Sequence, residues 1–80
     1  MEGKRMNYTI ASLDDVHNDQ QLELSTNGNQ YVVTLYHKET RESTRQSYYE
    51  MSGAYQLFEK LAHCICFGEY GYADRKKMFK

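Results

Sequence analysis

The chain lacks an excess of charge of either sign, and it lacks a long hydrophobic run. Ten Lys and Arg residues against eleven Asp and Glu residues leave a formal net charge of -1, so the molecule as a whole carries no field that would attract nucleic acid or an anionic membrane. No apolar run approaches the length of a membrane span, and residues 1–13 are too poor in apolar side chains for a secretory signal. These absences predict a cytoplasmic protein with no membrane partner.

The sequence also lacks a recognisable catalytic or cofactor-binding motif. It contains no glycine-rich phosphate cradle, no Ser/His/Asp grouping and no dense carboxylate cluster. Its 80 residues make one domain, which is below the size at which an enzyme easily holds a deep, water-excluded cleft. We therefore expect a protein that is not an enzyme, that needs no cofactor, and that acts by binding.

Cysteine is scarce, and the two present cannot bridge each other. Cys64 and Cys66 are two positions apart on an expected helix, so their side chains point about 200° apart. With His63 they radiate in three directions, and at most two of the three could reach one metal ion. His63 and Cys64 also diverge too far to act as a base and a nucleophile. We expect no disulfide and no metal site, in keeping with a reducing compartment.

The clearest structural signal is the stretch from Ser52 to Gly68. Ser52 can cap the start of a helix, and Gly68 can take the left-handed conformation that closes one. Between them the apolar residues recur at spacings of three and four, which places them on one face of a helix. These residues are Ala54, Leu57, Phe58, Leu61, Ala62 and Ile65.

A β-hairpin signal precedes this helix. Asn27-Gly28 favours a two-residue turn between apolar strands, and with that turn Leu24 faces Tyr31 while Leu22 faces Val33. A third strand, Glu42 to Glu50, follows the connection at 38–41. Its register is open, because a four-residue loop turns Tyr48 toward the core and a five-residue loop turns Tyr49 there. We favour Tyr48.

These signals predict an α+β fold of two layers, in which a three-stranded antiparallel meander carries one main helix on one face. Residues 1–7 are expected to be flexible, 8–51 mainly β with an additional short strand at Tyr8 to Ala11, and 52–68 helical. Residues 69–80 form a tail or a short helix, anchored by Met78 and Phe79. Nothing but the termini is left to cover the second sheet face, which is expected to be half apolar and aromatic.

That bare face and the charged ends of the chain supply the predicted partner-binding residues. Tyrosine and arginine are enriched at interface centres, because they combine a large contact area with a polar group. The stretch 11–30 carries acids and no Lys or Arg, as either an acidic contact surface or a solvated loop, while the C-terminal end is basic. The predicted set is Tyr36, Tyr49, Arg41, Arg45, Asp14, Asp15, Arg75, Lys76 and Lys77.

The favoured function is a protein-binding module. A second copy of the chain, meeting through the exposed face or the third-strand edge, is one form of it. One alternative is a nucleic-acid-binding module in which Tyr36 stacks on bases and Arg41 and Arg45 contact phosphates, although the net charge disfavours it. Further alternatives are a small homodimeric structural protein, and a monomer whose tyrosines merely line its core and rim.

The order of strand, Asn-Gly turn, strand, HKETRE connection, strand and helix over Leu22 to Gly68 resembles small phage and mobile-element accessory proteins, among them anti-CRISPR inhibitors. The similarity is one of layout, without a shared motif, so no functional residue carries over. The resemblance implies a stoichiometric inhibitor that blocks a nucleic-acid-processing nucleoprotein complex by surface contact. A net charge of -1 sets the chain apart from the members that mimic DNA.

Overall fold

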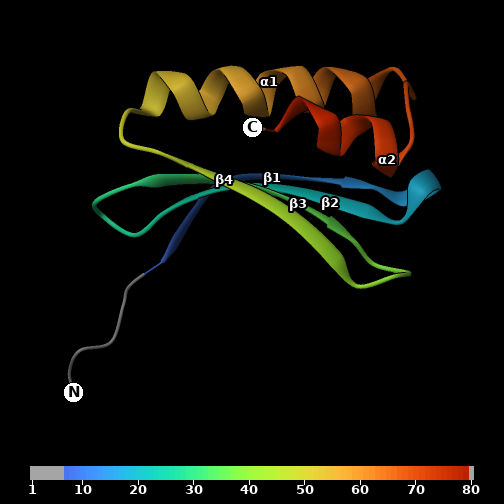
Figure 1. Ribbon diagram of the computed structural model, residues 1–80, viewed down its shortest axis with the longest axis horizontal. Coiled ribbons are helices and arrows are strands. Elements are labelled where there is room, and N and C mark those ends of the chain that lie inside the picture. Colours follow the sequence, from blue (N-terminus) through green and yellow to red (C-terminus); the bar gives the residue numbers. More distant parts are fainter. Residues whose placement is uncertain (1–6, 80) are drawn as a thin grey trace.

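Four consecutive strands form one antiparallel sheet, and the chain then crosses one face of that sheet as a helix (Figure 1). The computed structural model describes residues 7–79. The strands are β1 (Tyr8–Asp15), β2 (Gln20–Thr26), β3 (Tyr31–His37) and β4 (Glu42–Tyr48). The helices are α1 (Met51–Cys66) and α2 (Tyr72–Arg75), with single 3₁₀ turns η1 (Val16–Asn18) and η2 (Lys76–Met78). The α+β class is confirmed, and the flexibility expected for residues 1–7 falls almost wholly outside the described residues.

The sheet has four strands, so the expectation of a three-stranded meander is wrong. β1 pairs with β2 along nearly its whole length, from Tyr8 opposite Thr26 to Asp15 opposite Gln20, with a bulge between Thr9 and Ala11. The expected strand at Tyr8 to Ala11 is therefore real but too short. Its apolar alternation is weak and it ends in two acids, which is why the sequence alone gives it little support as a full strand.

The β2–β3 hairpin lies two residues away from the predicted register. Its loop spans Asn27–Gln30, so Leu24 faces Val33 and Leu22 faces Leu35. The Oδ1 atom of Asn27 accepts hydrogen bonds from the backbone N–H groups of Asn29 and Gln30, both at 2.9 Å, and this side-chain turn replaces the two-residue turn. Because side chains alternate with a period of two, the shift leaves each residue on its predicted face.

The β3–β4 connection has the four-residue length that turns Tyr48 inward. His37 pairs with Glu42, and Tyr31 pairs with Tyr48 at the far end of the ladder. Tyr48 therefore lies under α1, where its ring occupies the space beside Gly53. The favoured register is confirmed, while β4 ends at Tyr48 and not at Glu50.

α1 begins one residue before the predicted cap. Glu50 is its extended N-cap residue and makes no side-chain capping bond, so the assignment of Ser52 as the cap is wrong. At the other end Gly68 has a φ of 65°. Its N–H donates to the Ile65 carbonyl at 3.2 Å, and the Glu69 N–H donates to the Cys64 carbonyl at 2.7 Å. This pair of bonds is the Schellman arrangement, and it confirms the role expected of Gly68.

The core lies between the sheet and α1. Inward residues of β2 and β3 meet the apolar face of the helix, and their side chains exclude water almost completely. The buried apolar residues of this layer are Leu22, Leu24, Val33, Leu35, Ala54, Leu57 and Leu61.

The C-terminal segment, residues 69–79, packs on the same sheet face as α1, as the red ribbon in Figure 1 shows. The Tyr72 ring stacks on His37 with ring centroids 5.0 Å apart, and its hydroxyl is 2.9 Å from the Oγ1 atom of Thr44 on β4. Met78 and Phe79 pack against the core, as predicted. α1 and residues 69–79 thus both cover the same face of the sheet.

Candidate interaction surfaces

The open face of the sheet is the side opposite α1 and the C-terminal segment. Figure 1 shows the strands bending away from the helices at both ends, so the open face is concave. Strand register aligns its side chains in rows across the sheet. The central row is Ser12, Glu23, Thr34 and Arg45; beside it lie Asp14, Gln21, Tyr36 and Ser43 on one side and Ser25, Val32 and Ser47 on the other.

A hollow of about 410 Å³ occupies this concave face. Hydroxyl, amide, carboxylate and guanidinium groups line it, and Val32 is the apolar exception among the lining residues. The expectation of a half apolar and aromatic face is therefore wrong. The lining residues are Asn7, Thr9, Glu23, Ser25, Asn27, Gln30, Val32, Thr34, Arg45 and Ser47.

The charges of the hollow are balanced. Glu23 and Arg45 stand on β2 and β4 with Thr34 between them on β3, which separates their backbones by two strand spacings, about 10 Å. The hydroxyl of Thr9 donates to the Glu23 carboxylate at 2.5 Å. The hollow therefore offers one anchored anion and one exposed cation, a pattern that suits a polar surface with charges of both signs better than a polyanion.

The predicted aromatic and arginine residues separate into different places. Tyr36 and Arg45 lie on the open face, Tyr36 half-buried and Arg45 exposed. Arg41 is in the β3–β4 turn with a φ of 63°. Tyr49, 81% exposed, lies beyond the end of β4 beside Asn29 and the rest of the β2–β3 loop.

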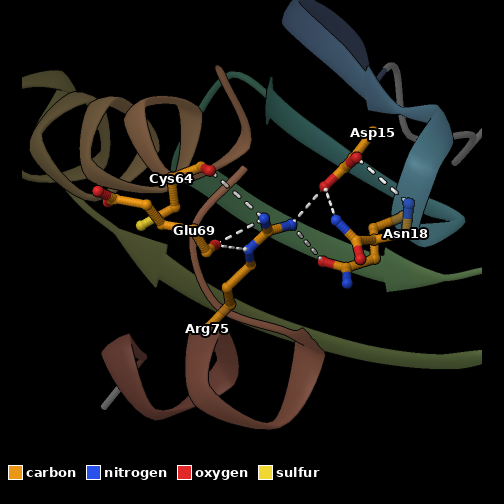
Figure 2. A network of polar contacts seen from close by, with 6 residues as sticks. Asp15, Asn18, Cys64, Glu69 and Arg75 are labelled. Carbon is orange, nitrogen blue, oxygen red and sulfur yellow. Dashed lines mark hydrogen bonds and ion pairs between the residues drawn. The ribbon is translucent and has the colours of Figure 1, made fainter. Parts of the chain in front are cut away.

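Asp15 and Arg75 do not lie on a surface at all. Arg75 is 0% exposed and Asp15 is 5% exposed, and Arg75 Nη1 lies 2.6 Å from Asp15 Oδ2. Nη1 also donates to the Gln20 side chain at 2.9 Å, while Nε and Nη2 donate to the Glu69 carbonyl at 3.0 and 2.7 Å. Figure 2 shows the guanidinium enclosed between the end of β1 and the loop after α1. In this structure the two residues hold the fold together and are not available to a partner.

The network alters the ionisation of its members. Burial alone would raise the pKa of Asp15, but hydrogen bonds from Arg75 and Asn18, together with the charge of Arg75, lower the pKa below its usual value. Asn18 contributes two of these bonds, from its backbone N–H at 3.3 Å and its amide nitrogen at 2.9 Å. Burial raises the pKa of the Cys64 thiol against the opposing charge of Arg75. Asp15 is thus a carboxylate, and Cys64 an unreactive thiol, at neutral pH.

The remaining charged residues of the predicted set are exposed and scattered. Asp14 lies 3.9 Å from Lys38, and Lys77 lies 3.7 Å from Asp74. Lys76 stands over the Tyr72 ring at 5.7 Å from its centroid. The predicted partner-binding residues therefore do not lie together on one surface. The hydroxyl-rich hollow was not predicted from the sequence, because isolated serines and threonines show no characteristic spacing.

The residue types that could bind a metal are also dispersed. Cys64 is buried and Cys66 exposed, while the exposed His63 ring leans on Phe67 at 4.4 Å between centroids. Within residues 7–79 no group of three or more His, Cys, Asp or Glu side chains is placed to hold a metal ion.

A second hollow, of about 510 Å³, lies between α1 and the C-terminal segment, and it is lined by Glu59, Lys60, His63, Cys64 and Met78.

None of the helices in the described part of the chain combines the length and the apolarity that crossing a membrane requires. Comparison with models of known protein families gives no match, and comparisons with curated proteins and with solved structures give none either.

Proposed function

We propose that this chain is a non-catalytic protein-binding module that contacts its partner through the open face. The observation that supports it is the concave hollow on a four-stranded sheet whose other face is covered by the chain itself. Hydroxyl and amide groups form hydrogen bonds with either donors or acceptors, which is the chemistry required to match another protein surface.

Glu23 and Arg45 would set the orientation of the partner. A partner surface with a basic group opposite Glu23 and an acidic group opposite Arg45 fits this row, because mismatched charges across an interface are costly. The narrower form of the proposal is an inhibitor of a nucleic-acid-processing complex, which would act by occupying a protein surface with this face. Nucleic acid itself is less favoured, because Arg45 is the lone cation among the lining residues and Glu23 offsets it.

Two substitutions test the open face. Thr34→Arg places a long side chain in the centre of the hollow, and Arg45→Glu reverses its cation. The partner is first captured from a lysate and identified. Each substitution is then expected to weaken binding of that partner, measured by titration, by about tenfold or more. Gln56→Arg, at an exposed position on α1, is the matched control and should leave binding unchanged.

The alternatives give different results in the same experiment. If both open-face variants bound the partner as the unmodified chain does, the proposed surface would be wrong. If a single-stranded oligonucleotide bound the unmodified chain at low salt and Arg45→Glu abolished that binding, the nucleic-acid alternative would replace the proposal.

A further inference from the structure

The concave open face is a trough that runs across the strands. Figure 1 shows that the strands bend along their own length, away from α1, so the trough crosses them. The row of Glu23, Thr34 and Arg45 has the same direction, because these residues lie opposite one another on β2, β3 and β4. Asn27 and Gln30, in the loop at one end of the strands, line the hollow on one side. The trough is therefore aligned with its two opposite charges.

A helix suits this trough better than an extended segment does. Glu23 and Thr34 stand on β2 and β3, the central strands, whose backbone groups are already paired with a neighbouring strand on each side. An extended segment lying on them would find no main-chain partner there, because strand addition takes place at a sheet edge. A helix satisfies its own backbone groups, and its convex surface fits lengthwise in a concave face.

The spacing of the two charges matches two turns of such a helix. Glu23 and Arg45 stand two strand spacings apart, about 10 Å at the backbone. Seven residues of an α-helix also advance about 10 Å and return to nearly the same side. A basic residue over Glu23 therefore places the residue seven positions away over Arg45, where an acid pairs with the guanidinium group. The Thr9 hydroxyl already holds the Glu23 carboxylate, so this anion is ordered before the helix arrives.

The central strand β3 offers apolar contacts between the two charges. Val32 and Tyr36 stand on either side of Thr34 on the open face, and both are half-buried. In a helix, the residues three and four positions after a given residue point to either side of the line that joins it to the seventh. They lie about 5 Å along the axis, which is one strand spacing and so above β3. Apolar side chains at these two positions would cover Val32 and Tyr36.

We propose that the open face receives an α-helix of the partner protein, laid across the strands, in which a basic and an acidic residue seven positions apart flank two apolar residues at the third and fourth positions. This inference rests on the proposed function, because it specifies which element of the partner occupies the face. An isolated helix buries less area than a whole partner surface, so we expect it to bind with a Kd of about 0.1 to 1 mM.

A synthetic peptide tests the pattern directly. The probe is a helix of about 20 residues, built from alanine and glutamine, with the central sequence Lys-Ala-Ala-Leu-Leu-Ala-Ala-Glu. In the control peptide the Glu is moved two positions further on, which turns it to the opposite side of the helix. NMR titration of the isotope-labelled chain should shift the amide resonances around Thr34, and the control peptide should bind about fivefold or more weakly.

Reversal of one charge should change which peptide the face prefers. In Arg45→Glu the row carries two acids, so a peptide with Lys at both charged positions should bind about fivefold or more tightly than the probe. Lys60→Glu makes the same reversal at an exposed position on α1, on the other side of the sheet, and should leave the order of preference unchanged. The same spectra show whether each variant is folded.

Three results overturn the proposal. They are a probe that does not bind at millimolar concentration, a control peptide that binds as well as the probe, and an Arg45→Glu chain that keeps the original preference. Failure of the proposed function gives a different result, because Thr34→Arg and Arg45→Glu would then bind the captured partner as the unmodified chain does. If those variants weaken partner binding while the peptides show no preference, the open face is the contact surface and its occupant is not this helix.

Discussion

The position of the C-terminal segment depends on the ion pair between Asp15 and Arg75. They are 60 positions apart in the sequence, yet the Arg75 guanidinium donates to Asp15, to Gln20 and to two backbone carbonyls. A buried ion pair returns little net stability over an apolar pair of the same shape, but the removal of one member leaves an unpaired charge. The pair therefore specifies where the C-terminal segment docks.

The ion pair between Asp15 and Arg75 should make the stability of the fold sensitive to acid. The folded-state pKa of Asp15 is lower than the unfolded value of about 3.8, so its contribution is complete above that pH and is lost as the pH falls through the folded pKa. Asp15→Asn should lower the free energy of unfolding by about 3 kcal/mol at neutral pH. The difference should shrink as the pH falls below about 3.8, which urea titrations at several pH values would measure.

Asp14→Asn is the control for this experiment. Asp14 is the adjacent acid in the same strand, but its side chain is 55% exposed and 3.9 Å from Lys38. An exposed pair of this kind contributes little, so the change should be within about 0.5 kcal/mol. An Asp15→Asn variant with the same stability and pH profile as Asp14→Asn would contradict the role assigned to Asp15.

The same pair marks the limit of sequence reasoning about single residues. Asp15 sits in an acidic stretch and Arg75 in a basic one, and charged residues in such runs usually face solvent. Their burial depends on the η1 turn at Val16–Asn18 and the loop after Gly68 converging in space, and no local pattern encodes that convergence. Tyr36 was placed correctly on the bare face by strand alternation alone. Arg45 was placed there by the favoured four-residue loop, which the pairing of Thr34 with Arg45 confirms.

At the scale of elements, the fold was predictable wherever periodicity was strong. α1 was predicted within one residue at its start from its apolar spacing, and the inward face of β3 was correct despite an incorrect loop length. The hairpin loop was mispredicted because side-chain hydrogen bonds to the backbone, as at Asn27, compete with the commonest turn geometry. The cap of α1 was mispredicted because the helix already begins at Met51, after an extended Glu50 that makes no side-chain capping bond. β1 was predicted only over Tyr8 to Ala11, because the rest of the strand has Leu13 as its single apolar residue and ends in two acids.

Gly53 shows how closely α1 approaches β4. A Cβ atom added there would lie 2.8 Å from Cδ2 of Tyr48, a contact that forces the ring to move. Gly53→Ala gains up to about 1 kcal/mol from helix propensity, but overpacking costs about 1 to 3 kcal/mol. We expect a net loss of about 1 kcal/mol in the free energy of unfolding, measured by urea titration.

The Tyr48→Ser background supplies the comparison. With the ring absent the added methyl group has room, so Gly53→Ala should there become stabilising by as much as about 1 kcal/mol. Equal effects of Gly53→Ala in the two backgrounds would mean that Tyr48 does not set the spacing between α1 and β4.

At the scale of the whole molecule, the short length of the chain determines which surfaces of the sheet are covered. An 80-residue chain is long enough to form about two layers of secondary structure. Here α1 and the C-terminal segment both pack on one side of the sheet. The opposite face of the sheet remains open among the described residues. The proposed partner contact lies on that face, whereas the basic end of the chain, expected to bind a partner, contributes Arg75 to the interior.

The C-terminal segment should therefore be indispensable to the folded state. Deletion of residues 70–80 removes Arg75 from the buried Asp15 carboxylate and uncovers the core beside Tyr48 and Leu57. An unpaired buried charge costs about 3 to 5 kcal/mol, a large share of the stability of so small a domain. We expect the truncated chain to lose its cooperative thermal transition and its near-ultraviolet circular dichroism.

A full-length variant with Lys76→Ser and Lys77→Ser separates charge from packing. It removes two exposed cations but keeps Arg75, Tyr72, Met78 and Phe79 in place, so its midpoint should stay close to that of the unmodified chain, within about 0.5 kcal/mol of stability. If the truncated chain unfolded as cooperatively as this variant, residues 70–80 would be an appendage to a domain that is complete at Glu69. The basic end of the chain could then again be considered as a contact surface, because nothing in the interior would require it.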